Sequence, residues 1–372
     1  MAEATHPPVV FARFTGETIL GEMGRLLYAI LNVFSNNGYR VLLFNDIDFS
    51  KLDKYGQRVP DIENLSLVDS VPGDTGQMFY LFDGEDRACS GRPWKKKIRV
   101  GFDVFATYWF TDPLIMPYPV HPLLSGADLP DRLDRLRQNR KSLRLFFSGD
   151  TKNYFRNRVH YPNSKLPRLE VIGTLLEDPD IRPIHADSEI TLRNRFEGEH
   201  SNDCVIVDTD KMWIDPSEWL PYMSKSDFFI CPPGYTMPMC HNVVEAMAVG
   251  TIPVINYPEW FNPTLKHMEN CIVFGDRADL VDRIKAVLAM DQAEVDELRK
   301  RVIDYYENHL NPGKFIRQIE TRKEHRLTVL MITDENTIRN ASRINGKSIL
   351  IRGKPLLADS SLYRLVHAWR TR

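Results

Sequence analysis

The segment 231–256, CPPGYTMPMCHNVVEAMAVGTIPVIN, predicts the fold of the region around it. The apolar run 226–231 has the length of a buried strand, and Pro-Pro-Gly ends that strand in a loop. Residues 238–249 then have helical periodicity, Gly250 stands where a helix ends in the left-handed conformation, and residues 251–255 resume as a strand. Strand, loop, helix and strand together make one parallel unit of an α/β domain.

The predicted helix carries one polar stripe on an otherwise apolar surface. His241, Asn242 and Glu245 follow one another at spacings that put them on one face. The stripe begins at the helix N-terminus, beyond the carboxyl end of a strand, where open α/β sheets bind ligands and where N–H groups attract phosphate. Glu245 lies deeper and suits a neutral hydroxyl pair, such as a ribose diol. The alternative is a solvated stripe on a surface helix.

Three blocks of the chain, in the correct order, resemble glycosyltransferases of the GT-B architecture, most closely the exostosin-like branch. In residues 229–255 the matching features are a strand ending in Cys-Pro, then Gly234-Tyr235, a helix with Glu-Ala, and Gly followed by Ile-Pro-Val-Ile. Residues 143–150, LRLFFSGD, resemble the strand that opens the second domain of that family. Residues 115–122, IMPYPVHP, resemble the proline-rich segment before it.

The resemblance implies an α/β fold of the GT-B type, with two Rossmann-like domains and a cleft between them. We therefore expect an acceptor domain over residues 1–140 and a nucleotide-sugar donor domain over residues 141–325. For residues 326–372 the sequence predicts an appended hairpin and tail, because two short apolar runs flank a polar turn.

The departures from the family pattern concern the donor diphosphate and the mechanism. The family usually has an Arg three residues before the helix Glu, and here that residue is Asn242. Retaining enzymes of the fold have a second Glu where this chain has Met237, which favours an inverting reaction. As replacement cations we select Lys152 and Arg156, which follow the small residues Ser148-Gly149. The alternative is that these cations are ordinary surface charges.

Two further groups complete the predicted site. Glu259, with Trp260 beside it, follows the strand after the helix and is a donor-side candidate. An inverting transfer needs a base for the acceptor hydroxyl. Asp103 and Asp112 flank an aromatic segment at the end of a first-domain strand, and Asp112 is slightly preferred. Other carboxylates remain open, namely Asp46, Asp48 and Glu22.

Composition limits the partners and the compartment. The 372 residues include 48 basic and 50 acidic ones, so nothing indicates a nucleic-acid partner. The five cysteines have no zinc-ligand spacing and suit reduced thiols. Since there is no long apolar run or signal segment, we expect a cytoplasmic protein, at most peripheral to a membrane. No Asp-x-Asp pair stands on a convincing strand end, which favours metal-independent chemistry without a cofactor.

The sequence therefore predicts a glycosyltransferase that moves a sugar from a nucleotide donor, with a UDP-sugar expected first, to a glycan or glycolipid in polysaccharide or glycoconjugate synthesis. A nucleotide-sugar epimerase of the same architecture would use the same pocket without an acceptor. A catalytically silent glycan-binding scaffold is the alternative from another class. The sequence leaves the oligomeric state open.

Overall fold

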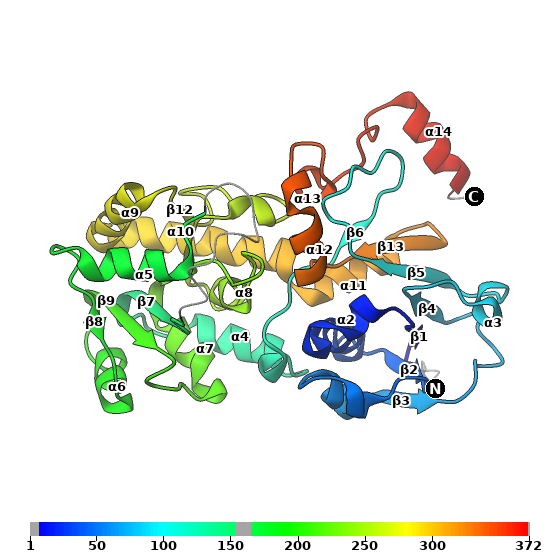
Figure 1. Cartoon of the computed structure of the whole chain (residues 1–372), viewed down its shortest axis with the longest axis horizontal. Coiled ribbons are helices and arrows are strands. Elements are labelled where there is room, and N and C mark those ends of the chain that lie inside the picture. The colour runs from blue at the N-terminus through cyan, green and yellow to red at the C-terminus, as the bar shows by residue number, and fades with distance from the viewer. Residues whose placement is uncertain (1–6, 153–164, 371–372) are drawn as a thin grey trace, which may run out of the picture. The chain divides into compact units, whose positions relative to one another are not determined.

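The computed structural model describes residues 7–152 and 165–370, which form two compact units (Figure 1). The first unit contains the residues up to Ala127, then Asn311–Asn336, and the residues from Arg343 on. The second contains Asp128–Leu310 and Thr337–Ser342. Each unit is built on its own parallel sheet with helices packed against it, so the predicted α/β fold with two Rossmann-like domains is confirmed.

The units divide at positions that differ from the predicted boundaries of 140 and 325. Helix α4, Leu129–Arg137, belongs to the second unit, because it packs on α7 and Arg137 Nε donates to the carbonyl of Ala248 at 2.8 Å. Helix α11, Pro312–Thr321, belongs to the first unit, because its apolar side packs on α2. α4 directly precedes the unit that it joins, whereas α11 joins a core that lies far from it in sequence, which local patterns do not reveal.

The first unit is a seven-stranded sheet in the order β3-β2-β1-β4-β5-β13-β6, in which the paired strands run parallel. Its strands are β1 Val9–Arg13, β2 Arg40–Phe44, β3 Leu65–Val68, β4 Phe79–Phe82, β5 Lys96–Gly101, β6 Leu114–Ile115 and β13 Arg326–Leu330. Its helices are α1 Glu17–Leu20, α2 Arg25–Asn36, α3 Arg87–Ser90, α11, α13 Ile349–Arg352 and α14 Ser361–Arg370, with the 3-10 turns η1 Glu22–Gly24, η2 Phe49–Lys51, η3 Gly56–Asp61 and η4 Pro122–Leu124.

Alternation along the strands gives this sheet two different faces. The helices α2 and α11 lie over one face (Figure 1), and side chains such as Ile98 and Val329 belong with theirs to the main core. On the other face, an aromatic cluster covers β1, β2 and β4, and Trp94 stacks on both Phe11 and Tyr80. Alternate residues of the strands therefore point into one or the other of two packed layers, and not alternately into the core and into solvent.

The predicted hairpin of residues 326–372 is wrong. Residues Arg326–Leu330 form β13, which pairs in parallel with β5 on one side and with β6 on the other. Helices follow it, beginning with α12, Asp334–Asn340. A strand that inserts between distant strands looks, in sequence, the same as a strand that turns back on its neighbour.

The second unit is a six-stranded sheet in the order β12-β11-β10-β7-β9-β8, with parallel pairing between neighbours. Its strands are β7 Leu143–Gly149, β8 Ile184–His185, β9 Ser201–Asp208, β10 Ser226–Ile230, β11 Ile252–Ile255 and β12 Ile272–Val273. Its helices are α4, α5 Arg168–Glu177, α6 Glu189–Glu197, α7 Pro216–Ser224, α8 His241–Ala248, α9 Arg277–Ala289 and α10 Gln292–Tyr305, with the short helices η6 Pro258–Trp260 and η7 Tyr306–Leu310.

The segment that predicts the fold is confirmed in its elements. β10 is followed by a loop, then by α8 and β11, and β10 and β11 pair in parallel. Gly250 ends the helix with φ +73°, the left-handed conformation that glycine adopts without strain. Pro253 lies inside β11, opposite Phe229. Asp215 caps α7, because its carboxylate accepts from the N–H of Ser217 at 2.8 Å.

All five cysteines are free thiols, and four of them are buried. None of the described helices combines the length and the apolar character that crossing a bilayer requires.

Candidate functional site

The order of strands in the second unit defines where a ligand would bind. From β7 the chain moves to β8 and β9 on one side, and then crosses to β10 and β11 on the other. The direction of winding therefore reverses between β7 and β10. Ligands of open α/β sheets bind outside the carboxyl ends of the two strands at such a switch point. The carboxyl end of β7 and the first turn of α8 meet at this place.

The end of β7 is held against the first turn of α8. Asn242 Nδ2 points to the carbonyl of Ser148 at 3.5 Å, the outer limit of a hydrogen bond. The Ser148 hydroxyl is buried and has no hydrogen-bond partner among the described residues. Sequence analysis selected Ser148, Gly149 and Asn242, and the structure brings them together at the start of a helix, where N–H groups are available to an anion.

A buried arginine that sequence reasoning missed lies at the same place. Arg168, the first residue of α5, is 9% exposed, and its Nη1 donates to the carbonyl of Asp150 at 3.2 Å. A Cβ added to Gly149 would be 3.6 Å from that nitrogen. Burial raises the pKa of the Cys240 thiol at the N-cap of α8, and the positive charge of Arg168 opposes that rise. The cation therefore acts at the N-terminus of α8.

Of the two cations that the sequence predicts, Lys152 is paired with carboxylates. Lys152 Nζ pairs with Asp150 Oδ2 at 3.0 Å and with Asp210 Oδ1 at 3.1 Å, and its side chain is 52% exposed. Both carboxylates hold the pKa of Lys152 above its usual range. The two aspartates therefore balance the positive charge of Lys152. Arg156 lies outside the described residues.

The loop between β10 and α8 is tight around Gly234. The N–H of Gly234 donates to the carbonyl of Pro238 at 3.2 Å, and a Cβ at Gly234 would lie 2.6 Å from the carbonyl oxygen of Met237. Any other residue would force the loop to move. Tyr235, the next residue, is 38% exposed and extends an aromatic ring from this loop.

The residues in the polar stripe of α8 differ in how deeply they are buried. His241 and Asn242 are half-buried, but Glu245 is 1% exposed, and its Oε2 accepts from the indole N–H of Trp219 at 2.7 Å. The alternative of a solvated stripe on a surface helix is therefore wrong for Glu245. Its carboxylate is part of the interior beneath the switch point.

Glu259 stands after β11, on the next loop of the same edge. Its Oε1 pairs with Lys165 Nζ at 2.8 Å. Trp260 is 2% exposed and packs in the core. The carboxylate thus has a cationic partner, and the tryptophan has the packing role.

The first unit has its own group of polar residues at the carboxyl edge of its sheet. Glu22 Oε1 accepts from the N–H of Asp334 at 2.5 Å, and Arg25 Nη2 lies 3.2 Å from Asp334 Oδ2 and 3.6 Å from Glu22 Oε2. Glu22 was one of several open carboxylates in the sequence. Its contact with Asp334 joins residues 312 positions apart, so no local signal could have selected it.

Burial and charge change how Glu22 titrates. Burial and, after it, the negative charge of Asp334 raise the pKa of Glu22 to about 7, although Arg25 opposes this rise. A carboxyl group with a pKa near neutrality can take up a proton at neutral pH.

The backbone at Glu22 is in an unusual conformation. Glu22, Met23 and Gly24 have φ values of 53°, 60° and 70°, three successive left-handed residues. Such strain outside glycine is characteristic of functional sites. A Cβ at Gly24 would meet the backbone of Gly56 at 2.2 Å, so only glycine can complete this turn.

The two carboxylates selected as bases each pair with an arginine. Asp112 Oδ2 pairs at 2.6 Å with Arg322, which precedes β13 and so lies toward the amino ends of the strands. Asp103 Oδ2 lies 3.2 Å from Arg343, whereas its Oδ1 is buried without a hydrogen-bond partner in the described part of the chain.

Within residues 7–152 and 165–370, no group of three or more His, Cys, Asp or Glu side chains could hold a metal ion. Independence from metal ions stays a prediction.

Comparison with known proteins gives matches among solved structures only. The chain matches no protein-family model and no curated protein. An α-glucosyltransferase in complex with UDP and a 13-mer DNA is 14% identical, with a TM-score of 0.39, over 83% of this chain and 98% of that chain. HepE from Anabaena, in complex with UDP and glucose, is 12% identical, with a TM-score of 0.39, over 85% and 98%.

A glycosyltransferase from Rickettsia africae is 7% identical, with a TM-score of 0.44, over 84% of this chain and 97% of that chain. Because these identities are low and each TM-score is below 0.5, we base the roles of the residues on the chain itself.

Proposed function

We propose that this chain is a glycosyltransferase that moves a sugar from a nucleotide-sugar donor, with UDP as the nucleotide expected first, to a hydroxyl group of a glycan or glycolipid. The observation that carries the proposal is the buried guanidinium of Arg168 beside Gly149, at the switch point and next to the N-terminus of α8. A glycine backbone, a helix N-terminus and a fixed cation together suit a diphosphate.

The donor would use the second unit. The diphosphate would lie against Ser148-Gly149 and the first turn of α8, with Arg168 balancing its charge and the Ser148 hydroxyl available to one of its oxygens. Arg168 has the role for which the sequence offered Lys152 and Arg156. The lack of an arginine at position 242 is therefore no argument for a catalytically silent scaffold.

The acceptor would use the first unit, with Glu22 as the base. In the inverting reaction that we propose, the acceptor oxygen forms a bond to the anomeric carbon as the bond from that carbon to the diphosphate oxygen breaks. The acceptor proton passes to the base, and the negative charge that develops on the leaving diphosphate is stabilised by the donor-binding groups. The chain supplies these groups itself, and we propose chemistry without a cofactor or metal ion.

A binding experiment tests the donor site before any acceptor is known. UDP, GDP and CMP are titrated by calorimetry into the wild type, Arg168→Lys and Lys152→Met. We expect one nucleotide to bind the wild type, to bind Arg168→Lys at least about tenfold more weakly, and to bind Lys152→Met almost as well. If none of the three nucleotides binds the wild type, the donor proposal is wrong.

A turnover assay with the sugar conjugate of the nucleotide that binds separates the remaining alternatives. Turnover that needs an added glycan or glycolipid supports the transferase. Conversion of the donor without any acceptor supports the epimerase, and binding without turnover supports the scaffold.

A further inference from the structure

The second face of the sheet in the first unit changes character at β5. Over β1, β2 and β4 it carries the aromatic cluster with Phe11 and Tyr80. Over β5 and β13 the same face carries polar side chains, because Ile98, Val100, Leu327 and Val329 all point into the main core on the opposite face. The aromatic cover therefore ends where a cationic surface begins.

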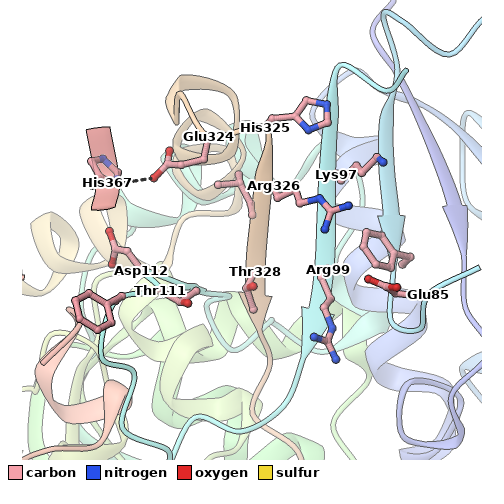
Figure 2. A pocket seen from close by; sticks show the side chains of 13 residues that line it. Glu85, Lys97, Arg99, Thr111, Asp112, Glu324, His325, Arg326, Thr328 and His367 are labelled. Atoms are coloured by element: carbon pink, nitrogen blue, oxygen red, sulfur yellow. Dashed lines mark ion pairs between the residues drawn. The ribbon is translucent and has the colours of Figure 1, made fainter. Parts of the chain in front are cut away.

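Register places these cations side by side. Arg326 is the partner of Lys97, and Thr328 is the partner of Arg99, on adjacent parallel strands. Figure 2 shows the four side chains on one face, with Arg326 extending from β13 toward β5. Two like charges that face each other on neighbouring strands repel, so this arrangement costs stability unless a negative group lies between them.

A pocket of about 480 Å³ opens over this patch. Its lining includes Lys97, Arg99, Arg326 and Thr328 from the strands, and also the rings of Phe82 and Phe110. A volume in this range is typical of small-molecule sites, and a mixture of aromatic and charged groups suits a ligand with an apolar face and a charged end.

Two of the three acidic residues that line the pocket pair with an arginine outside its lining. Asp112 and Glu324 both pair with Arg322, at 2.6 and 3.3 Å. In the described part of the chain, Arg99 and Arg326 have neither a hydrogen-bond acceptor nor an ion-pair partner. The side chain of Arg99 is exposed to the pocket. Two guanidinium groups thus remain available for the oxygens of one anion.

We propose that this pocket binds a sugar that carries a phosphate or sulfate ester, with the ester oxygens on Arg99 and Arg326. Phe82 and Phe110 would contact the apolar face of the sugar ring. Glu85, the third acidic residue of the lining, is suited to accept hydrogen bonds from sugar hydroxyls. The site goes beyond the proposed transfer reaction, since it includes neither the residues around Arg168 nor those around Glu22.

Titration calorimetry on the full chain tests this assignment. The probes are glucose 6-phosphate, glucose 6-sulfate, inorganic phosphate and glucose. The variants are Arg99→Gln/Arg326→Gln and, as a matched control, Arg40→Gln, which removes an exposed arginine from β2 of the same sheet. Arg168→Lys serves as a control for anion binding in the second unit.

We expect at least one of the two esters to bind the wild type, and the double variant to bind it at least about tenfold more weakly. Arg40→Gln and Arg168→Lys should bind it like the wild type. Preference for one ester over the other identifies the anion. If the double variant does not fold, the single variants Arg99→Lys and Arg326→Lys carry the test, because lysine keeps the charge but loses the bidentate contact.

Three results would overturn the proposal. One is that neither ester binds at millimolar concentration. Another is that the double variant retains full affinity while Arg168→Lys loses it, since the anion would then bind in the second unit. The third is that inorganic phosphate binds as tightly as glucose 6-phosphate, since the sugar would then contribute nothing. None of these results depends on whether the chain binds a nucleotide.

Discussion

Glu22 and Asp334 form a pair in which the carboxylate of Glu22 is hydrogen-bonded to the backbone of Asp334. Glu22 Oε1 accepts from the N–H of Asp334, while the two side chains share Arg25 between them. Burial raises the pKa of both groups, and Arg25 limits the rise. Because only one arginine faces two buried carboxylates, the carboxyl pair can gain a proton near neutral pH.

The first prediction concerns Glu22 as the base. Glu22→Gln should lower kcat at least about a hundredfold, because the amide cannot take up the proton, and should leave nucleotide affinity unchanged. The matched variants Asp103→Asn and Asp112→Asn should keep most of the activity. The measurement is the steady-state release of nucleoside diphosphate. A greater loss in Asp112→Asn than in Glu22→Gln would restore the assignment made from the sequence.

The second prediction concerns the pH dependence of the reaction. The base must be deprotonated, so the rate should rise as the pH increases through about 7, the pKa of Glu22. A profile of kcat/KM between pH 5 and pH 9 measures this limb. A rate limb centred near pH 4.5, the ordinary value for a glutamate, would contradict the role of the buried group.

The third prediction concerns stability and follows from the same group. The pKa of Glu22 is raised in the folded state, from 4.5 to about 7, so the folded protein binds its proton more tightly than the unfolded chain does. This contribution to stability is present below pH 4.5 and is lost as the pH rises through about 7. In thermal unfolding, the difference in Tm between Glu22→Gln and the wild type should therefore become more favourable to the variant as the pH rises over that interval. An unchanged difference would show that Glu22 titrates normally.

The fourth prediction concerns Gly234. Gly234→Ala places a methyl group against the carbonyl of Met237, so the loop must shift, with a loss of about 1–3 kcal/mol in the free energy of unfolding and weaker nucleotide binding. The control is Gly173→Ala in α5, where a Cβ meets no atom within 4 Å and alanine favours the helix. Denaturant unfolding measures both. Equal stabilities in the two variants would show that the loop adapts freely.

The fifth prediction separates the structural role of Glu245 from any role in binding. Glu245→Gln keeps an acceptor for the Trp219 N–H and should unfold close to the wild type. Glu245→Ala leaves that buried N–H unpaired and should cost about 1–3 kcal/mol. If Glu245 also holds a ribose diol, calorimetry should detect weaker nucleotide binding in the stable glutamine variant. Full affinity in that variant would limit Glu245 to packing.

Sequence patterns predict the second unit well where one element follows the next. β7, β10, α8 and β11 have clear periods and clear ends, and Ser148, Gly149 and Asn242 meet as the strand-loop-helix order requires. Patterns fail where pairing is distant. β3 and β4 are apolar runs of only four residues each inside an irregular stretch, and they pair with β2 and β1.

The missed site residues have the same explanation. Arg168 is one arginine after a proline, and only burial beside Gly149 distinguishes it from surface charges. Lys152 stands closer to the predicted loop, but two aspartates engage it. Charge alone does not reveal whether a cation is available, since that depends on neighbours that folding brings together.

The insertion of β13 between β5 and β6 has a consequence for how the protein forms during synthesis. When the ribosome has made residues 1–310, the second unit is almost complete, but the first sheet still lacks the strand that covers the edge of β5. That open edge can pair with other chains until β13 emerges. The second unit can therefore fold first, and a nascent chain that stalls before residue 326 exposes an aggregation-prone half of the molecule.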